Sequence, residues 1–439
     1  MKIISNGVCA PKGFMAGGIR CGIKQSLNAG SSQKKDLAMI YSPNPCSAAA
    51  MFTTNKVKAA SILVSQENIA DGQLRAVIVN SGNANACTGG QGLSAAKRMA
   101  RLAADALSIG VTEVAVASTG VIGVQLPVDV IEKNIDALKA ALRNDGQGHA
   151  DALEAIMTTD TRKKEIAVEI ELDGKPARIG AMTKGSGMIH PNMATMLAFI
   201  TTDAAIAPSV LDASLRLAVR RSFNRLTVDG DTSTNDMVIV MANGDAGNAP
   251  INSVCRKLDA RGQAALVKES SGCLKPEADE KQSDFCVFTS ALEFVCVELA
   301  KMMARDGEGA TKLVTVTVTG ASCEDTAETL AKSVASSSLV KAACFGADAN
   351  WGRVLCAMGY SGVDFTPEKA NVSFNSRAGL IRVYEEGRPV KFSEEKAKEI
   401  LSEEEIEISI SLNDGGGSAS AWGCDLTYDY VKINGDYRS

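Results

Sequence analysis

Short apolar runs alternate with segments of helical periodicity along most of this chain, and this alternation is the strongest limit on its fold. The runs 76–80 and 237–241 are mainly aliphatic and are followed by turn residues, as buried strands often are. The segments 93–107 and 291–304 instead carry apolar residues at helical spacing, which is typical of helices with one buried face. The alternation predicts an α/β protein whose sheets are covered by helices.

Two neighbouring strands are predicted to pair as a hairpin. The segments 164–172 and 177–182 flank Asp173 and Gly174, a pair of residues that two-residue turns favour. Another strand-like segment follows at 196–201, directly after a glycine-rich stretch.

The stretch 244–284 differs from the rest of the chain. It mixes Gly, Pro, Asn and charged residues, and it includes the run 275–281 with the sequence KPEADEK. Long polar connections of this kind usually lie at the surface. We therefore expect an exposed insertion here, partly helical around 262–268.

Composition excludes several classes of protein. The 439 residues carry 46 basic and 51 acidic side chains, a net charge of −5, and 45 % of them are hydrophobic. This balance does not favour binding to nucleic acid or to an anionic membrane, and no run reaches the ~18 apolar residues of a membrane span. The first residues lack the apolar core of a secretory signal, and none of the 12 cysteines forms a C-x-x-C pair. We expect reduced thiols and a cytoplasmic location.

Only two histidines are available for catalysis or metal binding. His149 follows the polar run 144–148, which predicts an exposed loop, and His190 precedes Pro191. A site with several histidine ligands is therefore poorly supported, and we expect no metal. A Ser-His-Asp or Cys-His site would have to use one of these two residues, so the base of an enzyme is expected to come from another group.

The densest unusual stretch is 183–197. Its glycines Gly185 and Gly187 permit backbone conformations closed to other residues, and Pro191 fixes a further dihedral. A loop of this kind can hold a peptide bond in a strained geometry, so that Thr195 attacks the carbonyl of Ala194. A threonine freed at a chain terminus also supplies its own base, because its α-amino group has a pKa near ~8. On spacing alone, a plain glycine-rich turn before a strand remains the simpler interpretation.

Other polar clusters are candidates for a binding site. Ser118, Thr119 and Gly120 follow a predicted strand, so their backbone N–H groups can point into a cleft and bind an oxyanion. The run 229–236 has the composition of a cation loop but lacks the ligand spacing of an EF-hand, which excludes that calcium site. Three further clusters have plain structural explanations. The cluster at 157–161 can be a turn or a helix cap, the one at 305–312 a helix end, and the one at 347–353 a packing turn.

Taken together, these motifs resemble those of the glutamate N-acetyltransferase / ornithine acetyltransferase family of arginine biosynthesis, the ArgJ family. The similarity runs nearly end to end. Seven ordered motifs are far more specific than any one of them, and they are Val79–Gly89, Ser118–Gly123, Ile156–Thr161, Lys184–Leu197, Asp229–Asp236, Asp306–Lys312 and Asn350–Arg353.

The resemblance implies a precursor that cleaves itself before the Thr of an Ala-Thr-Met-Leu motif. Here the cut falls between Ala194 and Thr195 and gives an α chain of residues 1–194 and a β chain of residues 195–439. The implied fold is a layered α/β sandwich shared with the DmpA-type aminopeptidases, with αβ units that assemble into an oligomer. The insertion at 244–284 departs from the family pattern, in which this segment is shorter, and it touches none of the seven motifs.

The reaction implied by the resemblance is acetyl transfer through a covalent intermediate, without metal or cofactor. Thr195 takes the acetyl group from N2-acetyl-L-ornithine, and L-ornithine leaves. L-Glutamate then accepts the acetyl group and becomes N-acetyl-L-glutamate. The resemblance leaves open whether acetyl-CoA is a second acetyl donor.

Motif position assigns roles to individual residues. Thr119 and Gly120 would form the oxyanion hole beside the nucleophile Thr195. Substrate contacts would fall on six positions, which are Thr158, Lys184, Thr195, Glu308, Asn434 and Ser439. Charge complementarity pairs Lys184 with the substrate carboxylate and Glu308 with the ornithine ammonium.

Two alternatives belong to other functional classes. The first is a self-processing aminopeptidase or hydrolase of the DmpA type, in which the new terminus is typically Ser. Thr195, together with the matches at Thr158 and Lys184, favours acetyl transfer. The second is an uncleaved binding or scaffold protein, which would stay a single chain.

Overall fold

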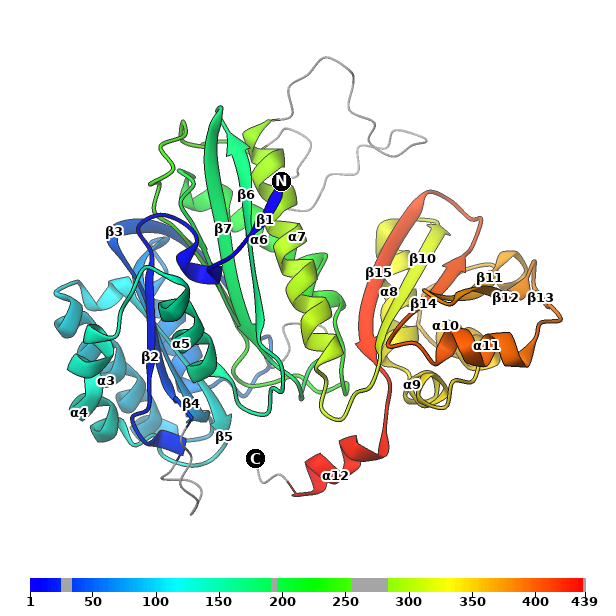
Figure 1. The fold of residues 1–439 in the computed structure, drawn as a ribbon, viewed down its shortest axis with the longest axis horizontal. Coiled ribbons are helices and arrows are strands. Elements are labelled where there is room, and N and C mark those ends of the chain that lie inside the picture. The colour runs from blue at the N-terminus through cyan, green and yellow to red at the C-terminus, as the bar shows by residue number, and fades with distance from the viewer. Residues whose placement is uncertain (25–33, 191–195, 255–282, 437–439) are drawn as a thin grey trace.

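The computed structural model describes residues 1–24, 34–190, 196–254 and 283–436. Within them the chain forms two β-sheets, each covered by helices, with the helix α7 (Asp284–Arg305) between the sheets (Figure 1). The predicted α/β architecture is therefore confirmed. No helix in the described part of the chain combines the length and apolar character needed to cross a membrane.

The larger sheet has nine strands in the order β1-β6-β7-β8-β9-β3-β4-β5, with β2 paired to β3 off this path. Its strands are β1 (Lys2–Ile4), β2 (Met15–Ile19), β3 (Leu37–Phe52), β4 (Gln73–Asn83), β5 (Val114–Val121), β6 (Lys164–Leu172), β7 (Lys175–Lys184), β8 (Leu197–Thr202) and β9 (Met237–Ala242).

Both faces of this sheet are covered, which explains why its strands read as continuous apolar runs. In β4, for example, Ala76 and Ile78 pack with α3 and α4, whereas Val77 and Val79 lie in a separate cluster with α5 on the opposite face. The covering helices are α2 (Ala60–Asn68), α3 (Gly89–Leu107), α4 (Val128–Ala140), α5 (Gly146–Ile156), α6 (Pro208–Arg220) and α7.

The smaller sheet has six strands in the order β13-β12-β11-β14-β10-β15. They are β10 (Leu313–Ala321), β11 (Asn371–Ser376), β12 (Gly379–Glu385), β13 (Arg388–Pro389), β14 (Glu405–Ser411) and β15 (Gly417–Cys424). Its helices are α8 (Glu324–Ser336), α9 (Ser338–Phe345), α10 (Trp351–Gly359) and α11 (Glu394–Leu401). The last helix, α12 (Tyr428–Asp436), returns from this sheet toward the larger one (Figure 1).

The segments on the two sides of the predicted cut share one sheet. Strand β7 pairs antiparallel with β8 over six residue pairs, and β3 pairs antiparallel with β9 over another six. The β7 and β8 register places Lys184 opposite Leu197. Because β7 and β3 precede residue 194 and β8 and β9 follow it, a cut at that point would leave the two chains joined by ladders of hydrogen bonds.

Several expected elements differ in their bounds. The hairpin is confirmed, and its turn residues Asp173 and Gly174 both have positive φ, 52° and 70°, as a type I′ turn requires. Helix α3 begins four residues earlier than expected, at Gly89, and Thr119 and Gly120 lie inside β5 instead of after it.

The expected insertion at 244–284 lies mostly outside the described residues, including the predicted short helix. Its first part is not a simple surface loop: Ala246 and Ile251 are buried, and Ile251 forms a β-bridge with Ile206. At the other end, Asp284 already belongs to α7.

The expectation for His149 was wrong. The polar run before it contains Asp145, whose carboxylate caps α5 by accepting the N–H groups of Gln147 and Gly148. His149 therefore lies in the first turn of a helix and is only 2 % exposed. Its Nδ1 accepts the N–H of Val8 at 3.3 Å, and its Nε2 contacts Glu165. This histidine joins the N-terminal segment to the sheet.

Candidate functional site

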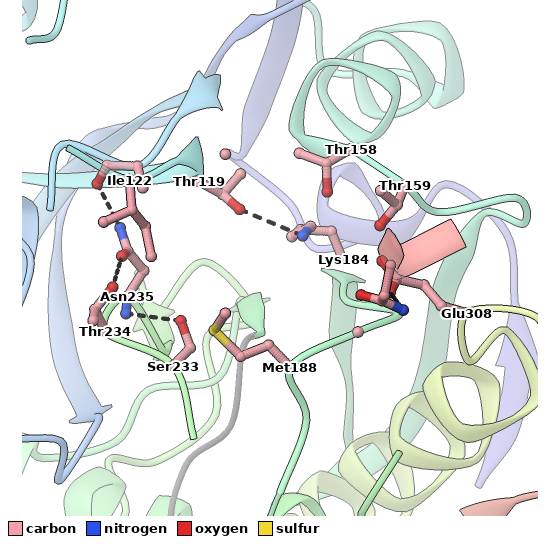
Figure 2. Close-up of a pocket in the computed structure, with 14 residues that line it drawn as sticks. Thr119, Ile122, Thr158, Thr159, Lys184, Met188, Ser233, Thr234, Asn235 and Glu308 are labelled. Atoms are coloured by element: carbon pink, nitrogen blue, oxygen red, sulfur yellow. Dashed lines mark hydrogen bonds between the residues drawn. The ribbon is translucent and has the colours of Figure 1, made fainter. Parts of the chain in front are cut away.

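Six of the predicted site residues lie together in one pocket, at the ends of β5 and β7 (Figure 2). They come from five separate segments of the sequence. The complete lining is Ala84, Thr119, Gly120, Ile122, Thr158, Thr159, Lys184, Gly187, Met188, Ser233, Thr234, Asn235, Glu308 and Asn434. No histidine is part of this lining among the described residues.

Thr119 and Gly120 are brought to the pocket by the parallel pairing of β5 with β4. Gly120 has φ 135°, and a Cβ on it would lie 2.2 Å from the carbonyl carbon of Gly82. Only glycine fits this close approach of two backbones. The preceding Ser118 is turned into the sheet, where its hydroxyl donates to Asn80 Oδ1 at 2.7 Å.

Asn235 fixes the peptide group before Thr119. Its Nδ2 donates to the carbonyls of Ala84 at 2.7 Å and Ser118 at 2.8 Å. In a trans peptide the C=O and the N–H point in opposite directions, so the amide of Thr119 faces away from Asn235. The Thr119 hydroxyl lies beside Lys184, whose ammonium donates to it.

Lys184 ends β7 and is 3 % exposed. Its Nζ donates to Thr119 Oγ1 at 3.4 Å. Burial lowers the pKa of Lys184, and the carboxylates of Asp160, Glu308 and Asp236 act in the opposite direction. An ammonium group in this setting can bind a substrate carboxylate from which water has been displaced.

Glu308 faces the pocket from the loop that follows α7. Its backbone N–H donates to the carbonyl of Ser186 at 2.8 Å, and its Oε2 accepts from Nδ2 of Asn434 at 3.0 Å. The carboxylate lies directly against Gly187, where a Cβ would come within 2.3 Å of Oε2. The contact with Asn434 brings the exposed helix α12 to the edge of the pocket.

A buried ion network supports the loop that carries Thr158. The backbone N–H of Thr158 donates to Asp160 Oδ2 at 3.0 Å, and the N–H of Gly185 donates to Asp160 Oδ1 at 2.8 Å. Lys164 joins the two carboxylates of Asp160 and Asp306. Because Asp306 lies two residues before Glu308, this network connects three parts of the pocket.

The predicted cleavage residues Ala194 and Thr195, and the predicted C-terminal contact Ser439, lie outside the described residues. The described chain resumes at Met196, whose N–H donates to Asp236 Oδ1 at 3.0 Å. The β7 and β8 register places Leu197, two residues after Thr195 in the sequence, opposite Lys184.

Eight lining residues were not predicted one by one. They are Ala84, Ile122, Thr159, Gly187, Met188, Ser233, Thr234 and Asn235. All of them lie within the motifs that carry the family resemblance. That membership was the available signal, but a single sequence does not say which motif residues face the cavity.

The motif around Trp351 is a packing element. Asn350 caps α10 by accepting the N–H of Arg353, and Trp351 stacks on Tyr384 with ring centroids 5.3 Å apart. The structure thus supports the interpretation of this motif as a packing turn.

Comparison with known proteins identifies the family of this chain. The ArgJ family model matches residues 15–439. The arginine biosynthesis bifunctional protein ArgJ of Symbiobacterium thermophilum is 49 % identical over 439 residues, which cover all of both chains.

Two solved structures are also similar. The crystal structure of the arginine biosynthesis bifunctional protein ArgJ from Bacillus halodurans is 44 % identical, with a TM-score of 0.46 over 54 % of this chain and 98 % of that one. Ornithine acetyltransferase from Mycobacterium tuberculosis, complexed with ornithine, is 38 % identical, with a TM-score of 0.39 over 43 % of this chain and 97 % of that one. On the family match and the full-length identity, this chain belongs to the ArgJ family.

Proposed function

We propose that this chain is an acetyltransferase of arginine biosynthesis that moves the acetyl group of N2-acetyl-L-ornithine to L-glutamate. The observation that carries the proposal is the pocket itself, where a buried Lys184 and the carboxylate of Glu308 lie with the hydroxyl of Thr119. An acetylated amino acid with a carboxylate and an amine matches this arrangement of charges. Family membership supports the same reaction.

In the proposed cycle, Thr195 is both nucleophile and, through its free amino group, base. The amine takes the proton of the Thr195 hydroxyl as the oxygen attacks the acetyl carbonyl of N-acetylornithine. The negative charge that develops on the carbonyl oxygen is stabilised by Thr119 and Gly120. The proton then passes to the ornithine nitrogen, the C–N bond breaks, and ornithine leaves. The amine of glutamate attacks the acetyl ester in the reverse sense and regenerates Thr195.

The free amine requires processing of the chain between Ala194 and Thr195, so we propose that the chain cleaves itself there. The resulting α chain (1–194) and β chain (195–439) would remain partners, since strands from both sides of the junction share one sheet. We further propose that the αβ units assemble into an oligomer in the cytoplasm, and that the reaction needs neither metal nor cofactor. Acetyl-CoA is a candidate second donor.

The test is the fate of the acetyl group. Purified protein is incubated with acetyl-labelled N-acetylornithine, with and without glutamate, and the labelled products are separated. Label found mainly in N-acetylglutamate supports the proposal. Label found mainly as free acetate, whether or not glutamate is present, would instead identify a hydrolase.

A further inference from the structure

One short segment of the β chain holds backbone amides on both sides of the predicted junction. On the N-terminal side, the carboxylate of Asp229 accepts the N–H of Met188 at 2.6 Å and the N–H of Ile189 at 2.8 Å. The backbone takes part as well, because the N–H of Val228 donates to the carbonyl of Ile189 at 2.8 Å.

Asp236 makes the corresponding contact on the C-terminal side. Its Oδ1 accepts the N–H of Met196 at 3.0 Å, and the N–H of Met237 donates to the carbonyl of Met196 at 3.0 Å. Asp236 is fully buried, and its second oxygen, Oδ2, accepts no hydrogen bond from the part of the chain that the structure describes.

These contacts carry energetic costs that ordinary loop packing does not require. Burial raises the pKa of both carboxyls, so their charged forms are disfavoured in the fold. Met188 has φ 56°, a left-handed conformation that is strained for a residue with a side chain. Backbone strain and raised carboxyl pKa values of this kind concentrate at functional sites.

Self-cleavage makes a demand that the mature reaction does not. In the precursor the nitrogen of Thr195 is part of a peptide bond, so it cannot act as the base. The reaction then depends more heavily on orientation, because the hydroxyl must reach the carbonyl of the residue before it. Misplacement by about 1 Å can cost about 10²-fold in rate.

We propose that Asp229 and Asp236 are positioning residues for self-cleavage, a clamp that holds the chain on both sides of the junction by its backbone amides. The inference rests on the proposed self-processing. After the cut, Asp236 holds the β chain one residue from its new terminus. Asp229 holds the α chain close to its end.

The two aspartates use their oxygens differently, which gives the proposal a specific signature. An amide side chain has one acceptor oxygen, whereas a carboxylate has two. Asp236 uses only Oδ1 for the Met196 amide, so Asp236→Asn can keep the contact. Asp229 uses Oδ2 for Met188 and Oδ1 for Ile189, so Asp229→Asn must lose one of them.

The experiment follows the appearance of two chains by intact mass, in a time course from freshly made precursor. Asp236→Ala is expected to slow processing by about 10²-fold, and Asp236→Asn to restore it close to the wild-type rate. Asp229→Asn is expected to slow it by about 10–100-fold, as the loss of one buried hydrogen bond would. Asp231→Asn is the matched control, because the Asp231 side chain is exposed and its contact with Asp229 is made by its backbone N–H, which Asn keeps, and it should process normally.

A second readout does not need cleavage. In an uncut Thr195→Ala background, Asp236→Ala should increase hydrogen exchange at the Met196 amide, and Asp229→Ala should increase it at Met188 and Ile189. Unchanged exchange in both variants, or an Asp236→Asn protein that processes as slowly as Asp236→Ala, overturns the clamp. A wild-type chain that stays uncut overturns the proposed self-processing and the clamp with it, whereas a chain that cuts normally in all the variants overturns the clamp alone.

Discussion

The ammonium of Lys184 donates a hydrogen bond to the hydroxyl oxygen of Thr119 at 3.4 Å. A hydroxyl can accept and donate at the same time, so this contact leaves the Thr119 proton available to a third group. The contact also joins the end of β7 to β5. The pocket therefore presents an oriented hydroxyl donor next to a positive charge, which is the arrangement expected around a developing oxyanion.

Removing the Thr119 hydroxyl should impair the chemical step. We expect Thr119→Ala to lower kcat by about 10²–10³-fold, as the loss of one oxyanion donor does. Thr119→Ser keeps the hydroxyl and should retain most of the activity. Steady-state kinetics of glutamate acetylation from N-acetylornithine measures both variants. Equal rates for the Ala and Ser variants would assign the donor to the backbone and not to the side chain.

Neutralising Glu308 should affect the two substrates unequally. Ornithine carries a side-chain ammonium and glutamate does not, so Glu308→Gln should raise KM for N-acetylornithine by about 10–100-fold and change KM for glutamate much less. Initial-rate kinetics with each substrate varied in turn measures the difference. Equal effects on both would show that Glu308 does not bind the ornithine ammonium.

Asn235 should matter for the rate although it was not predicted as a site residue. Asn235→Ala leaves the buried carbonyls of Ala84 and Ser118 without this donor, at a cost of about 1–3 kcal/mol for an unsatisfied group. Because Asn235 orients the peptide before Thr119, kcat should fall as well as the melting temperature. A variant that loses stability and keeps the full kcat would limit Asn235 to a structural role.

The charge of Asp160 should make the stability of the fold depend on pH in the acid range. Burial acts to raise its pKa, but the charges of Lys184 and Lys164 outweigh burial and hold the pKa below its ordinary value of 3.8. The stabilisation is therefore present above that ordinary value and is lost as the pH falls toward the folded-state pKa.

Asp160→Asn should cost about 3–5 kcal/mol near neutral pH, as breaking a buried ion pair does. Melting temperatures of the wild type and the variant should differ by a constant amount above about pH 5 and should converge as the pH falls from about 4 toward 2. A difference that stays constant down to about pH 2 would contradict an ionised Asp160 in the fold.

The elements predicted correctly from the sequence are those whose local residue pattern matches their surroundings in the fold. The hairpin at Asp173 and Gly174 is correct because both residues accept positive φ, and β4 was visible because both of its faces are buried. His149 was misplaced because the polar residues before it form a helix cap, and capping residues and loop residues are of the same types.

The candidate site was predicted through the family motifs more than through physical pattern. Thr119, Lys184 and Glu308 come from distant segments, and only the tertiary fold shows that they share a pocket. Asn235 was missed because its role depends on the carbonyls of Ala84 and Ser118, which no spacing rule relates to it.

The central claim is that Thr195, freed by cleavage, carries the acetyl group. The most direct measurement is the intact mass of the purified protein before and after exposure to N-acetylornithine without glutamate. We predict two chains, one that ends at Ala194 and one that begins at Thr195. The second chain should gain one acetyl group, which is removed when glutamate is supplied. An uncut chain, or an acetyl group that still forms and transfers in Thr195→Ala, would contradict the account.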